Sequence, residues 1–121
     1  MKKLFIVVCF CWLSNIGFAQ APVVVVPRYE YMQVTTIESL LAAGVGRSRM
    51  LVTDKTGQAQ ELPMANVFSL GGINFSNIKD NDKSITLKLN ELTEQGWELA
   101  ETTAAANNDI FITRYLLRRP K

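Results

Sequence analysis

The run L-N-E-L-T-E-Q-G-W-E-L, residues 89–99, decides the fold, because it reads as a helix that ends at a glycine and passes directly into a strand. Leu89 and Leu92 share one face of a 3.6-residue helix, and Ile85 extends this face by one turn. Gly96 stands where helices end in left-handed backbone, which a residue without a side chain adopts at no steric cost. The sequence therefore predicts a helix that ends just before Gly96.

The strand that follows begins with Trp97. Side chains alternate along a strand, so Trp97 and Leu99 lie on the same face. We expect this face to form the core together with the apolar face of the helix and alternate residues of the last strand. Phe111 and Tyr115 are the candidates from that last strand.

The main helix is predicted at about 84–95, because Asp82 and Ser84 are both good N-caps. Aromatic and β-branched runs predict strands at 29–37, 47–53, 97–103 and 110–118, and 58–62 is read as a possible hairpin arm after the turn at 54–57. A short helical run is expected near 39–43, and 63–81 reads as a packed loop. The fold class that follows is α+β, a small antiparallel sheet of about four strands packed against one main helix.

Residues 1–19 have the features of a secretory signal peptide. Lys2 and Lys3 precede a short uncharged apolar run at 4–13, and small residues stand at Gly17 and Ala19, where a signal peptidase cleaves. We expect cleavage after Ala19 and a periplasmic or secreted protein with no membrane span after cleavage. Residues 20–28 then form an extended leader, and 29–121 form a single domain.

Removal of the expected signal peptide changes the charge and the cysteine content. The two cysteines of the sequence, Cys9 and Cys11, are removed with the signal peptide, so the exported chain has no disulfide. Of the 13 basic residues, Lys2 and Lys3 go, which leaves 11 against 11 acidic residues. A net charge near zero argues against nucleic acid as a partner.

The sequence lacks the residues on which much catalysis and metal binding depend. It contains no histidine, so the usual base near neutral pH is missing. The spacing of Asp80, Asp82, Ser84 and Glu91 imitates a calcium loop, but Ile85 occupies the position that needs a turn-forming glycine. We therefore predict no catalytic residue, no cofactor and no metal site.

Glu98 and Glu101 invite a reading as a catalytic carboxylate pair, but residues three apart on a regular strand face opposite sides. Most aromatic residues are expected in the core, but one or two exposed tyrosines on the first strand could serve recognition. The arginines of the last strand could form a basic patch, although a charged strand end that protects a sheet edge is the more common explanation. The candidates for a recognition surface are Tyr29, Tyr31, Arg114 and Arg118.

Three pieces of the chain together resemble a family of small exported proteins classed as a domain of unknown function. They are Y-E-Y at 29–31, the run at 89–99, and Y-L-L-R-R-P at 115–120. The resemblance covers the two ends well and the middle, about 38–83, poorly. It implies an α+β fold with an antiparallel sheet and one main helix, and it carries over no catalytic residue.

We therefore expect an exported, non-enzymatic binding module whose partner is a protein or another component of the cell envelope. Two alternatives remain open. One is a small hydrolase or glycan-acting enzyme that works with carboxylates, and the other is an assembly protein that forms homo-oligomers through an edge strand.

Overall fold

The computed structural model describes residues 28–41 and 46–121. The expected signal peptide, all but the last residue of the expected leader, and part of the expected short helix lie outside these residues. Within them, the element order is β1 (Tyr29–Ser39), β2 (Arg49–Thr53), β3 (Ala59–Pro63), β4 (Phe68–Ser69), β5 (Gly72–Ile73), α1 (Phe75–Glu94), β6 (Glu98–Ala106) and β7 (Ile110–Pro120).

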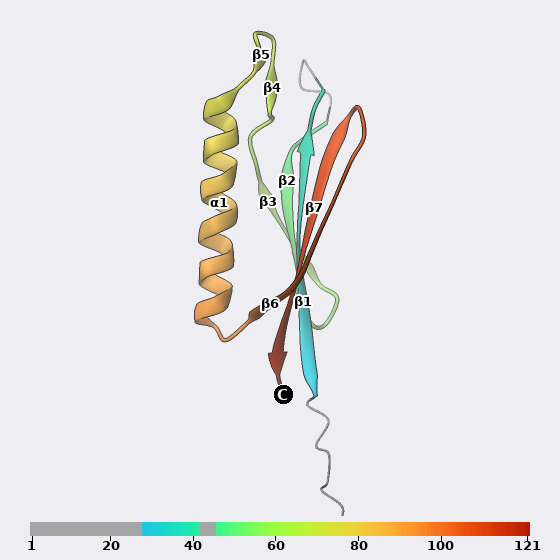
Figure 1. Cartoon of the computed structure of the whole chain (residues 1–121), viewed down its shortest axis with the longest axis vertical. Coiled ribbons are helices and arrows are strands. Elements are labelled where there is room, and N and C mark those ends of the chain that lie inside the picture. Colours follow the sequence, from blue (N-terminus) through green and yellow to red (C-terminus); the bar gives the residue numbers. More distant parts are fainter. Residues whose placement is uncertain (1–27, 42–45) are drawn as a thin grey trace, which may run out of the picture.

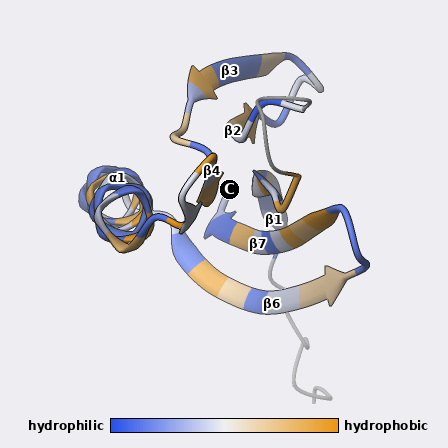
Figure 2. Cartoon of the chain, turned by 90° about the horizontal axis from the view of Figure 1, so that it is seen from above, coloured by the Kyte–Doolittle hydropathy of each residue, from blue (hydrophilic) through white to orange (hydrophobic). Residues whose placement is uncertain are grey.

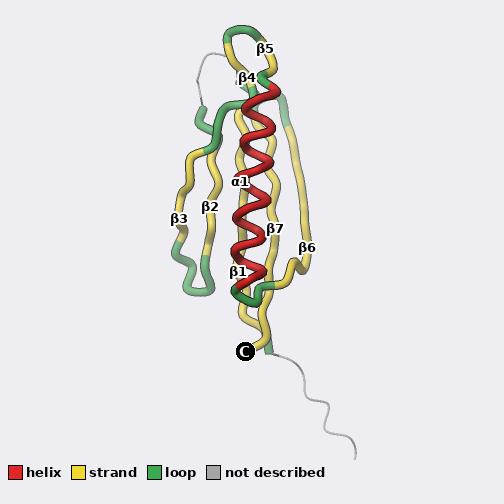
Figure 3. The backbone as a smooth tube through the Cα atoms, turned by 90° about the vertical axis from the view of Figure 1, so that its left-hand side faces the viewer, coloured by secondary structure: helices red, strands yellow, loops and turns green. Residues whose placement is uncertain are grey.

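Five of the strands form one antiparallel sheet in the order β3-β2-β1-β7-β6, and β4 pairs with β5 in a small second sheet. The two longest strands, β1 and β7, pair along their whole length at the centre of the large sheet. α1 lies along one side of this sheet, as Figures 1 and 3 show. Seen from above, the sheet curves, and its far side carries no described element (Figure 2).

The predicted fold class is wrong in its balance of elements. About half of the described residues are in strands and about a fifth are in the helix, so the domain is mostly β. The large sheet has five strands instead of about four, and the expected loop at 63–81 contains the second sheet and the first part of the helix. The turn at 54–57 is confirmed, since the Gly57 N–H donates to the Asp54 carbonyl at 3.0 Å and Gly57 has a φ of 85°.

The helix begins at Phe75, well before the predicted start at Asp82 or Ser84. Asn74 is the N-cap, and its side-chain oxygen accepts a hydrogen bond from the Asn77 N–H. The expected helix face is present but longer than predicted, and Asn81 occupies one of its positions. Asn81 is buried with 2 % of its surface exposed, and its side chain binds both the N–H and the carbonyl of Ala65.

The helix end is confirmed. Gly96 has a φ of 86°, its N–H donates to the Thr93 carbonyl, and the Trp97 N–H donates to the Leu92 carbonyl. This pair of hydrogen bonds is the Schellman arrangement, which brings the residue after the glycine against the last turn of the helix. Trp97 is accordingly 4 % exposed and packs in the same cluster as Leu92.

The core lies between α1 and the three strands β2, β1 and β7. Its buried members are Val34, Met50, Ile85, Leu92, Trp97 and Leu117, with Leu89 and Tyr115 among the partly buried residues around it. The predictions for Leu99 and Phe111 are wrong, since these side chains are 53 % and 36 % exposed. A helix about 10 Å wide covers only two or three strands spaced about 4.8 Å apart, so the edge strand β6 and the far end of β7 are left uncovered.

Candidate binding surface

The strand register places all four predicted recognition residues on one face of the sheet. Tyr31 is paired with Arg118 and Thr35 with Arg114, and Tyr29 lies two residues before Tyr31. Paired residues and residues two apart share a face, and this is the face turned away from α1. We call it the outer face.

Three of these residues form one contiguous group at the end of the sheet where β1 begins. The rings of Tyr29 and Tyr31 have their centres 6.5 Å apart and tilted at 53°. The guanidinium carbon of Arg118 lies 4.8 Å from the centre of the Tyr29 ring, within the range of a cation–π interaction. Arg114 lies further along β7, beside Glu101 and Thr103, and is separate from this group.

A hollow of about 680 Å³ adjoins the tyrosines. It exists because β2 pairs with β1 only as far as Gln33, so the first residues of β1 extend beyond the β2–β3 turn. The hollow is lined by Tyr29, Glu30, Tyr31, Asp54, Lys55, Thr56, Gly57 and Lys121. Tyr31 is half exposed there, which leaves its ring available to a ligand.

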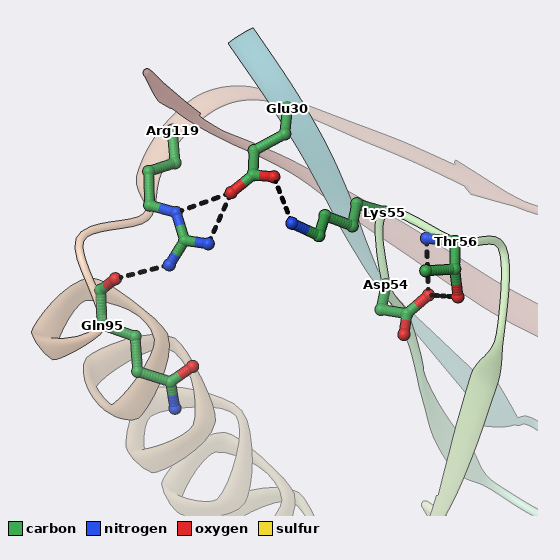
Figure 4. Close-up of polar contacts among 6 residues, drawn as sticks. All are labelled: Glu30, Asp54, Lys55, Thr56, Gln95 and Arg119. Carbon is green, nitrogen blue, oxygen red and sulfur yellow. Dashed lines mark hydrogen bonds and ion pairs between the residues drawn. The ribbon is translucent and has the colours of Figure 1, made fainter. Parts of the chain in front are cut away.

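Charged side chains form a chain of ion pairs beside this hollow, and Figure 4 shows them. The Lys55 Nζ lies 2.7 Å from one carboxylate oxygen of Glu30, and Arg119 donates to the other oxygen. These interactions, with Lys55 first, hold the pKa of Glu30 below its ordinary value of 4.5. Glu30, Lys55 and Arg119 together carry one surplus positive charge.

Arg119 also connects this cluster to the helix. It donates to the carbonyl of Gln95, the C-cap of α1, at 3.0 Å. The Asp54 carboxylate accepts hydrogen bonds from the side chain and the N–H of Thr56, which lower its pKa and stiffen the turn. The walls of the hollow are thus held by hydrogen bonds on both sides.

The prediction that Glu98 and Glu101 face opposite sides is wrong. The register between β6 and β7 shifts between Leu99 and Glu101, which marks a β-bulge at Ala100. Glu98 is opposite Arg118 and Glu101 is opposite Leu116, so both carboxylates lie on the outer face. Glu98 lies 3.9 Å from the Arg118 Nε, at the margin of the tyrosine group.

Two other features of the described residues bear on function. Among residues 28–41 and 46–121, no group of three or more acidic or other metal-binding side chains could hold a metal ion. No helix in this same part of the chain is long and apolar enough to cross a membrane.

Comparison of the chain with protein-family models, with characterised proteins and with solved structures finds no match. The resemblance to an exported family of unknown function therefore stays a prediction, and the function has to be argued from the surface itself.

Proposed function

We propose that this protein is an exported, non-enzymatic binding module whose contact surface is the group formed by Tyr29, Tyr31 and Arg118 with the hollow beside it. The observation that carries this proposal is the half-exposed Tyr31, which lies with Tyr29 next to a hollow of about 680 Å³. Tyrosine and arginine are the residue types that binding surfaces favour, because they offer a large contact area and directed hydrogen bonds at a small entropic cost.

The electrostatics of the hollow support binding over acid–base catalysis. Glu30 is its central carboxylate, and its ion pairs with Lys55 and Arg119 lower its pKa. A carboxylate in this condition is a poor proton donor and a weak base near neutral pH. The absence of histidine from the sequence removes the residue that most often fills either role.

Export is supported by the charge, the apolar run and the small residues of the first 19 positions. The partner in this proposal is therefore a component of the cell envelope or its surroundings. N-terminal sequencing of the protein from its own cells should begin at Gln20, and a protein that keeps Met1 would contradict export with cleavage.

The binding surface is tested by immobilising the protein and identifying what it retains from its own envelope fraction. The variant Tyr29→Ser/Tyr31→Ser should lose the retained component. The matched control is Leu87→Ser, which removes an exposed apolar side chain from α1, on the other side of the molecule. If both variants retain the component equally, the proposed surface is wrong.

A second candidate function, assembly of identical copies, is favoured by β6. All nine residues of this edge strand are exposed, and 104–106 carry only alanines, without the charges or prolines that usually protect an edge. Sedimentation over a wide concentration range tests this idea. Self-association that Ala104→Lys abolishes would support it, and a monomer at all concentrations would contradict it.

A further inference from the structure

Two backbone hydrogen bonds show which residues of β1 face which neighbouring strand. The Lys121 N–H donates to the Arg28 carbonyl at 2.9 Å, and the Leu40 N–H donates to the Asp109 carbonyl at 2.8 Å. Both pairs continue the β1–β7 register. In an antiparallel ladder, residues bond alternately to one side and to the other. Even-numbered residues of β1 therefore bond to β7, and odd-numbered residues point toward β2.

Tyr29 and Tyr31 are odd-numbered, and β2 does not reach them. The pairing between β1 and β2 begins at Gln33, which lies opposite Thr53, so the residues of β1 before Gln33 have no partner in β2. By the same alternation, the main-chain N–H and carbonyl of both tyrosines point to the side of β1 on which the pairing with β2 has already ended. Two donors and two acceptors thus point from Tyr29 and Tyr31 into the hollow, in the spacing that an added strand requires.

The side chains around this open edge define what an added strand would carry. Residues opposite Tyr29 and Tyr31 would point to the outer face, beside the two rings. The residue between them would point to the inner side, where Glu30, Lys55 and Arg119 have one surplus positive charge. The Lys55 side chain is 55 % exposed, so its ammonium group can donate a hydrogen bond to a second carboxylate beside that of Glu30.

We propose that the hollow binds a short extended peptide segment, which pairs with the main chain of Tyr29 and Tyr31 and directs a central acidic side chain to Lys55. This inference rests on the proposed function, since it names the partner of the same surface. The peptide lies beside β1 in the position that β2 would occupy if it continued beyond Thr53. The apolar residues on either side of the acidic residue pack against the tyrosine rings.

The main-chain groups of Tyr29 and Tyr31 that β2 leaves unpaired favour a peptide over a glycan. A sugar would stack on the rings and bond to side chains, but it would leave the donors and acceptors of Tyr29 and Tyr31 without a matched partner. An extended peptide satisfies all four groups, which is how strand addition produces affinity. The surplus charge of the Glu30 cluster then selects the acidic side chain.

The probe is acetyl-Thr-Val-Glu-Val-Thr-amide, titrated into the isotope-labelled protein and followed by the amide resonances of Tyr29 and Tyr31. Both amides should shift, and the Kd should rise about tenfold when the central residue of the peptide is Lys. N-methylation of one valine nitrogen removes a single main-chain donor and should weaken binding by about the same factor. Equal affinity for the N-methylated peptide would overturn strand addition.

The charge preference is tested by Lys55→Glu, which should bind the Lys-centred peptide more tightly than the Glu-centred one. Lys79→Glu, an equal change of net charge on α1, should keep the preference of the parent protein. Unchanged preference in Lys55→Glu would overturn the role of Lys55. Binding of a chito-oligosaccharide at Tyr29 and Tyr31, with no peptide binding, would contradict the peptide and leave the proposed binding surface standing. The proposed binding surface would also be supported, independently of the peptide, if the Tyr29→Ser/Tyr31→Ser variant retained no envelope component while Leu87→Ser still did.

Discussion

The guanidinium carbon of Arg119 lies 4.5 Å from the centre of the Trp97 ring. The same guanidinium donates to Glu30 on β1 and to the Gln95 carbonyl at the end of α1. One side chain of β7 thus holds together the helix end, the start of β6 and the first residues of β1. The open edge at Tyr29 and Tyr31 begins beside this contact, so the core and the candidate binding surface share a support.

The substitution Trp97→Ala should lower the free energy of unfolding by about 3–5 kcal/mol, because it empties a buried site in the core and removes the stacking partner of Arg119. Trp97 is 4 % exposed. Denaturant unfolding of the variant and the parent measures the difference. A loss under about 1 kcal/mol would mean that the ring is not part of the core.

The substitution Gly96→Ala should cost about 1 kcal/mol, because the φ of 86° at this residue strains any side chain. The space is not limiting, since an added Cβ would meet the Arg119 Cδ at an ordinary 3.5 Å. Gly71→Ala is the matched control, because its nearest neighbour is the Ser69 Oγ at 3.9 Å and its φ is not positive. Equal effects of the two substitutions on Tm would contradict the left-handed helix end.

Stability should fall in acid as Glu30 is protonated. Its pKa in the folded protein lies below the ordinary 4.5, mainly because of Lys55 and then of Arg119. A carboxylate with a lowered pKa stabilises the fold above its unfolded pKa, and this contribution disappears as the pH falls through the folded value. Glu30→Gln should therefore lower Tm at pH 7, and the difference from the parent should vanish in acid. Glu94→Gln, at the exposed end of α1, should change Tm little at either pH.

The substitution Asn81→Leu should destabilise the protein by at least about 2 kcal/mol, although it makes the helix face more apolar. It leaves the partly buried N–H and carbonyl of Ala65 without their partner, and an unsatisfied buried polar group costs about 1–3 kcal/mol. Chemical unfolding again measures the change. Asn90→Leu is the control, at an exposed position of α1, and a more stable Asn81→Leu variant would contradict the assigned role.

The end of the helix could be predicted from sequence because its determinants are local. Gly96 and the spacing of Leu89 and Leu92 are sufficient for it. The beginning of the helix could not be predicted, because the polar residue Asn81 interrupts the apolar spacing. The hydrogen-bond partner that explains Asn81, Ala65, is distant in sequence. In the sequence, Asn74 looks like a loop residue. Only the hydrogen bond that its side chain accepts from the Asn77 N–H identifies it as the N-cap of the helix.

The error at Glu101 has a different cause. Alternation along β6 is interrupted by the bulge at Ala100, which depends on how β6 pairs with β7 and not on β6 alone. Tyr29 and Tyr31 could be proposed as recognition residues from their type and position. Their open edge could not be predicted, because it depends on the residue at which β2 stops pairing with β1.

Amide hydrogen exchange of the purified protein without ligand tests the central claim, the open edge of β1, most directly. Met32 bonds to β7 and Gln33 bonds to β2, so both amides should exchange slowly. The Tyr31 amide lies next to them in the same strand but points into the hollow, so it should exchange much faster than either. A Tyr31 amide protected as well as Met32 and Gln33 would show that the edge is already covered, and would contradict the account.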